Sequence, residues 1–133
     1  MKIYHASPDY IESFDFSYGV HFGGIFSAYE AGLRKLSNLQ KYKDVVQDHI
    51  FVHVCVLDTS AELYKSIDVG SKEEWDKEIQ KAKALGFKGI VYKNLYEPDL
   101  VSSYLIFDST LITIEDIDPI DSEEAERLLS WEE

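Results

Sequence analysis

The side chains best suited to chemistry lie near the beginning of this chain of 133 residues. In the segment IYHASP, His5 is followed by two small residues, Ala6 and Ser7. In the segment GVHFGG, His21 and Phe22 stand between glycines. An imidazole can donate or accept a hydrogen bond, and small residues leave the neighbouring backbone accessible. These residue types could bind a polar ligand, and we expect short extended segments to present them.

Generic catalytic signatures are absent from the sequence. It has no phosphate-binding G-x-x-x-x-G-K loop, no G-x-G-x-x-G, no G-x-S-x-G and no H-E-x-x-H. The histidines at positions 5, 21, 49 and 53 lack the close spacing of a local metal site, so no metal is expected. His53 and the single cysteine, Cys55, lie in the apolar run IFVHVCVL. This setting predicts a hydrogen-bonded core histidine and a buried, unreactive thiol.

The formal net charge of −12 restricts the kinds of partner that the chain can have. An acidic surface repels phosphate backbones, which argues against direct binding of nucleic acid. The charge serves solubility, or it attracts a partner with a basic surface. No run approaches the roughly 20 apolar residues that cross a bilayer, and MKIYHASP lacks the features of a signal peptide. We therefore expect no membrane association and a cytoplasmic location.

Length and hydrophobic patterning predict one domain over residues 1–133, an α+β fold without linkers or repeats. Apolar residues at nearly every position of 50–57 indicate a central strand that is covered on both faces. Ser71 and Glu74 form a capping-box pattern that opens a helix ending at Gly86. Further strands are expected at 2–5, 88–92, 104–107 and 111–114, and further helices at 27–41, capped by Ser27, and at 121–131, capped by Asp121.

A third segment, GFKGIVYKN, leads through Glu97 to SYLIFD at 103–108. In order and spacing the three segments resemble the ADP-ribosyltransferase superfamily on its poly-ADP-ribose-polymerase and diphtheria-toxin side, above all the compact versions carried by phages and other mobile elements. That family pattern is a strand-borne histidine, a G-[IV]-aromatic-F stretch before a helix with a tyrosine, and a late strand of the form E-Y-I-V-Y. The matching segments are residues 2–29 and 86–114. The resemblance implies a mixed, mainly antiparallel split sheet with flanking helices.

The resemblance also implies that NAD is the substrate. His5 would hydrogen-bond the adenosine-side ribose, and the backbone of Ala6, beside Ser7, would meet the nicotinamide amide. Tyr29, with His21 or Phe22 nearby, would stack on the nicotinamide ring. An aromatic face tolerates the positive pyridinium that is lost when the glycosidic bond breaks.

The sequence departs from the family pattern at the catalytic acid. The glutamate that precedes the Y-I-V-Y stretch is replaced by Ser103, which cannot supply a negative charge. Candidates to replace it are Glu97, Asp99 and Asp108. Some phage-type relatives carry an N-x-x-E element, matched here by Asn94 to Glu97, so Glu97 is expected to be catalytic together with His5.

Three functions follow from the resemblance. The first is NAD-dependent transfer of one ADP-ribose to a macromolecule, a protein with a basic surface in preference to a nucleic acid. The mobile-element versions suggest a target among bacterial defence proteins, as for anti-CRISPR ADP-ribosyltransferases, and hence action in the bacterial host cytoplasm. The second is an inactive protein of the same fold whose acidic surface blocks a basic partner. The third is NAD hydrolysis, in which water is the acceptor.

Overall fold

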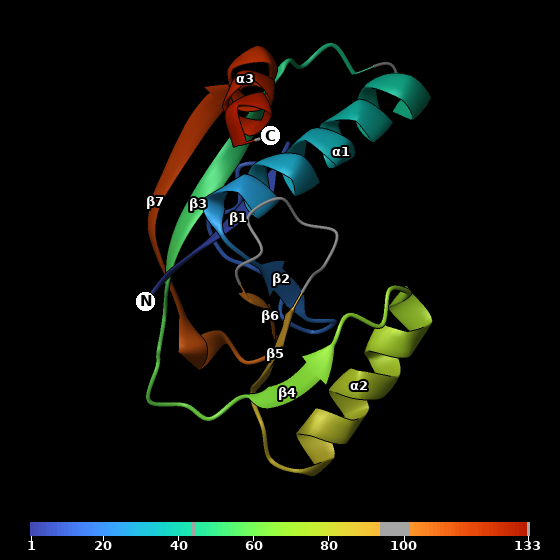
Figure 1. Cartoon of the computed structure of the whole chain (residues 1–133), viewed down its shortest axis with the longest axis vertical. Coiled ribbons are helices and arrows are strands. Elements are labelled where there is room, and N and C mark those ends of the chain that lie inside the picture. The colour runs from blue at the N-terminus through green and yellow to red at the C-terminus, as the bar shows by residue number, and fades with distance from the viewer. Residues whose placement is uncertain (44, 94–101, 133) are drawn as a thin grey trace.

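The computed structural model describes residues 1–43, 45–93 and 102–132, and this part of the chain forms two open β-sheets and three α-helices (Figure 1). The α+β class is confirmed, and both sheets are mostly antiparallel. Two helices cover the three-stranded sheet and one covers the four-stranded sheet (Figure 1).

The three-stranded sheet has the order β1 (Lys2–Ser7), β3 (His49–Leu57) and β7 (Ile112–Asp121). β3 is its central strand, as the run of apolar residues predicts. Ile50 and Val52 face the helices, whereas Cys55 and Leu57, of opposite parity, face the other sheet. Both faces of β3 are therefore covered, which explains why its sequence does not alternate between apolar and polar residues.

β7 is much longer than the strand expected at 111–114. A 3-10 turn over Ser109–Leu111 precedes it, and it pairs with β3 up to Asp121. The full strand is not predicted from the sequence, because this segment contains many acidic residues and a proline, Pro119. β7 is an edge strand in which polar residues face solvent and a missing N–H is tolerated, so these residues fit it.

The four-stranded sheet has the order β2 (Val20–Phe22), β6 (Ser102–Ile106), β5 (Gly89–Lys93) and β4 (Tyr64–Ile67). β4 runs parallel to β5 and was not predicted, because its four residues, YKSI, are half polar. One bridge joins the two sheets. The N–H of Tyr4 donates to the carbonyl of Gly23 at 2.8 Å, and the N–H of Gly23 donates to the carbonyl of Tyr4 at 3.0 Å.

The helices are α1 (Ile25–Lys43), α2 (Lys72–Ala84) and α3 (Ser122–Glu132). The prediction that Ser27 caps α1 is wrong. The carbonyl of Gly24 accepts the first helical bond, from Ala28, so the helix already includes Ser27. The cap of α2 is confirmed, because Ser71 Oγ accepts from the N–H of Glu74 at 3.2 Å.

In the part of the chain that the structure describes, three apolar clusters hold the elements together. One lies between α1, α3 and the three-stranded sheet, one between the two sheets, and one between α2 and the four-stranded sheet. The middle cluster joins Ile3 and Cys55 of one sheet to Phe22 and Ile106 of the other. This contact fixes β1 against β2, and the two histidine segments are carried by these strands.

Candidate functional site

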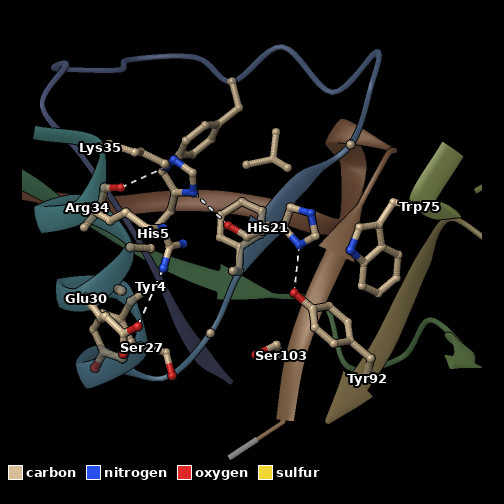
Figure 2. Close-up of a pocket in the computed structure, with 18 of the residues that line it drawn as sticks. Tyr4, His5, His21, Ser27, Glu30, Arg34, Lys35, Trp75, Tyr92 and Ser103 are labelled. Atoms are coloured by element: carbon tan, nitrogen blue, oxygen red, sulfur yellow. Dashed lines mark hydrogen bonds and ion pairs between the residues drawn. The ribbon is translucent and has the colours of Figure 1, made fainter. Parts of the chain in front are cut away.

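A pocket of about 750 Å³ opens where β1, β2 and α1 meet. Its walls also include the chain between β1 and β2, the start of α2, and β5 and β6. This volume is in the range of pockets that bind small molecules and cofactors. Figure 2 shows Arg34 and Lys35 on one side of it and Trp75 and Tyr92 on the opposite side. His5 and His21 lie between these two ends (Figure 2).

The imidazole of His5 has a defined tautomer. Its Nδ1 lies 2.7 Å from the carbonyl oxygen of His21, and because a carbonyl can only accept, Nδ1 carries the proton. Burial in the pocket and the positive charge of Lys35 lower the pKa of His5 to about 3. His5 is therefore neutral at pH 7, and its Nε2 has a lone pair that can accept a hydrogen bond from a ligand hydroxyl.

His21 borders the aromatic end of the pocket. Its Nδ1 lies 2.7 Å from the hydroxyl of Tyr92, and its ring meets that of Trp75 edge-on at 5.5 Å. The residue as a whole is exposed, but neighbouring pocket residues partly exclude water from its ring. This partial removal from water, together with the charge of Lys35, lowers the pKa of His21 to about 4. The two histidines thus give the pocket polar walls without positive charge at neutral pH.

His53 lies behind the pocket and is fully buried, as expected of a core histidine. Its Nδ1 donates to the carbonyl of His5 at 3.1 Å, and its Nε2 accepts from the N–H of Ile11 at 3.0 Å. The ring is neutral in this arrangement, because Nε2 can accept only when it carries no proton. His53 therefore ties the segment around Ile11, which lines the pocket, to β1.

One corner of the pocket is formed by small residues. A methyl group placed on Gly23 would lie 3.3 Å from Cβ of Ser27 and 3.4 Å from Oγ of Ser103. Both serines are buried and line the pocket. Ser103 occupies the position at which the resemblance expects the catalytic glutamate, so a neutral hydroxyl stands at this wall of the site.

The structure brings together His5, Ala6, His21 and Phe22, four of the residues that the resemblance assigned to NAD. Ser7 does not line the pocket, and its Oγ accepts from the N–H of Asp9 at 3.1 Å.

Tyr29 is also absent from the pocket lining, although it was expected to stack there. Two residues along a helix turn the side chain by about 200°, so Tyr29 points away from the side that carries Ser27. Its ring packs in the cluster between α1, α3 and the three-stranded sheet, where it meets Phe26 at 6.1 Å.

The acids proposed in place of the missing glutamate are not in the described lining. Glu97 and Asp99 lie outside the described residues. Asp108 caps the 3-10 turn, where its carboxylate accepts from the N–H of Thr110 at 2.9 Å, and it does not line this pocket.

Among the lining residues that sequence reasoning missed are Arg34, Lys35, Trp75 and Tyr92. For α1 a signal was present, because Ser27, Ala31 and Lys35 repeat at intervals of four and so share one helix face. No local pattern marks Trp75 or Tyr92, since both also read as ordinary core positions of α2 and β5.

No family model, curated protein or solved structure matches this chain. Within the described ranges, no cluster of three or more histidine, cysteine, aspartate or glutamate side chains could hold a metal ion. None of the described helices is both long enough and apolar enough to cross a membrane.

Proposed function

We propose that the chain is an NAD-dependent mono-ADP-ribosyltransferase with the compact fold of that superfamily. The observation that supports this most is that one pocket collects His5, Ala6, His21 and Phe22. These residues come from two separate sequence segments, which are two of the three segments that carry the family resemblance. The expected target is a protein with a basic surface, such as a bacterial defence protein reached in the host cytoplasm.

In this proposal, the neutral His5 accepts a hydrogen bond from a ribose hydroxyl through Nε2, while its Nδ1–H stays on the carbonyl of His21. The backbone at Ala6 and the small corner around Gly23 give a flat nicotinamide room to approach. Trp75 and His21 supply the aromatic surface that the family places beside the pyridinium. Tyr29 does not have this role, because its side chain is packed in the core.

The reaction breaks the C–N glycosidic bond of NAD, and the electron pair leaves with nicotinamide. The ribosyl carbon becomes positively charged, and a nucleophile on the target forms the new bond and loses its proton. A carboxylate near that carbon lowers the barrier. Glu97 is proposed for this role, since Ser103 cannot carry the charge.

The experiment incubates the purified chain with NAD and a bacterial lysate, and then measures released nicotinamide and protein intact mass. Activity predicts target proteins heavier by one ADP-ribose. Glu97→Gln should lose transfer by a factor of at least about 100, a typical loss when one group that stabilises transition-state charge is removed. Ser103→Ala serves as the control and should retain most activity. If the wild-type chain neither releases nicotinamide nor modifies any protein, the proposal is wrong.

A second candidate is an inactive protein of this fold that occupies a basic partner surface. Two observations favour it: the neutral Ser103 at the acid position, and the exposed acids that follow one another along β7 and into α3. These acids are Glu115, Asp116, Asp118, Asp121 and Glu123. Binding of this kind would weaken steeply with salt and would not respond to Glu97→Gln. Release of nicotinamide without any protein acceptor would instead indicate an NAD glycohydrolase.

A further inference from the structure

The end of the pocket at α1 carries two adjacent cations, Arg34 and Lys35. This concentration is unusual in a chain with 13 basic and 25 acidic residues, because the protein as a whole repels anions. The pocket is also lined by Asp15, Glu30 and Asp68, so attraction for an anion is confined to the end at which Arg34 and Lys35 adjoin.

Lys35 is only partly neutralised by the protein. Its Nζ donates one hydrogen bond, to the carbonyl of Ala6 at 3.2 Å, and an ammonium has three donors. Across residues 1–43, 45–93 and 102–132, no carboxylate lies within 4.0 Å of this ammonium. Partial removal from water and the charge of Arg34 lower the pKa of Lys35, whereas the negative charge of Asp9 raises it. A cation in this environment gains stability when an anion approaches.

Arg34 has an acidic neighbour, Glu30, one helical turn away. The Nη1 of Arg34 lies 3.6 Å from Oε1 of Glu30, beyond ordinary hydrogen-bond length. Its side chain is 60% exposed, so the guanidinium can turn toward a ligand at the cost of a weak surface ion pair. The planar group has five N–H donors, enough to bind phosphate oxygens in pairs.

We propose that Arg34 and Lys35 form the diphosphate subsite of the pocket, with Lys35 as the main contact, and that the ligand class is a nucleoside diphosphate. The diphosphate lies between α1 and the backbone of Ala6, next to His5, and the rest of the ligand extends toward His21 and Trp75. This inference rests on the proposed function in one respect, namely that the nucleotide bound during catalysis is NAD.

The test is calorimetric titration of the full chain with ADP and with adenosine, which lacks phosphate. Wild type should bind ADP at least about tenfold more tightly than adenosine, the ratio that corresponds to one charge-assisted hydrogen bond. Lys35→Gln should weaken ADP binding by about tenfold or more and leave adenosine binding within about twofold. Arg34→Gln should act in the same direction with a smaller factor, because the guanidinium must first leave its ion pair with Glu30.

Lys41→Gln is the matched control, since it removes the same charge from the same helix at an exposed position outside the pocket. It should leave ADP affinity unchanged. Lys35→Arg keeps the charge and should retain most of the affinity, which separates loss of charge from damage to the fold. The subsite proposal would be overturned if Lys35→Gln lowered the affinities for ADP and for adenosine by the same factor, or if it left the affinity for ADP unchanged. It would also be overturned if the wild-type protein did not bind ADP.

The two proposals can fail separately. If Lys35→Gln lowers the affinity for ADP and the wild-type protein releases no nicotinamide from NAD, the subsite proposal is supported and the transferase proposal is wrong. If wild type modifies proteins while Lys35→Gln binds ADP normally, the transferase stands and the subsite falls.

Discussion

The close approach of α1 to β1 depends on Gly32, and replacing it with alanine tests the packing that positions Lys35. In an unconstrained helix interior, Gly→Ala stabilises by roughly 1 kcal/mol because alanine loses less backbone entropy. Here the added Cβ would lie 2.8 Å from Cβ of Ala6 and 2.9 Å from Cδ1 of Ile50. Both distances are shorter than van der Waals contact, so the helix or the sheet must shift.

The steric cost is expected to exceed the gain in helix propensity. The terminal methyl of Ile50 can rotate away, but Cβ of Ala6 is fixed to the backbone of β1, which is paired along its length with β3. Overpacking of this kind costs roughly 1–3 kcal/mol. Gly32→Ala should therefore lower the free energy of unfolding by about 1 kcal/mol. Lys35, three residues further along α1, also contacts Ala6, so ADP affinity should fall as well.

Urea denaturation followed by circular dichroism measures this effect. Asn38→Ala, at an exposed position of the same helix, is the control and should stabilise by roughly 0.5 kcal/mol, because only propensity changes there. The two substitutions are thus expected to have opposite signs. A Gly32→Ala protein that is as stable as, or more stable than, wild type would refute the argument from close packing.

Three further predictions concern the pocket, a helix cap and the core. The folded-state pKa values of His5 and His21, about 3 and about 4, lie below the ordinary value of 6.5. As the pH falls, the unfolded chain therefore takes up protons before the folded protein does. The free energy of unfolding should be highest above pH 6.5 and should decrease toward pH 4. His5→Asn keeps a donor for the carbonyl of His21 but does not titrate, so denaturation at pH 7.5 and 5 should show a smaller loss in it than in wild type. Ser71→Ala removes the cap of α2 and should cost about 1 kcal/mol in urea denaturation, and no loss would mean that the bond to Glu74 is dispensable. Cys55 is fully buried, and burial raises its pKa to about 12, so a thiol reagent should label it only after unfolding; rapid labelling of the native protein would contradict the packing between the sheets.

Part of the candidate site could be predicted from sequence, because strand ends and glycines are local features. An extended segment with a histidine is predicted from each of the sequences IYHASP and GVHFGG. Residues of both segments line the same pocket. The aromatic partner could not be predicted correctly. Tyr29 lies close to the second segment in sequence, yet the helical turn directs it into the core. Trp75 comes from a distant helix and reaches the pocket only through packing of α2 on the four-stranded sheet.

By itself, the sequence determined the elements with strong local signals: the buried strand predicted at 50–57, the cap at Ser71 and the end of α2 just before Gly86. Hydrophobic periodicity and capping act over a few residues, so they can be read without knowing the fold. Only the tertiary structure decided that β7 extends to Asp121 and that α1 brings Lys35 against Ala6. Edge pairing and helix–sheet contact depend on residues far apart in the chain, and local propensity carries no information about them.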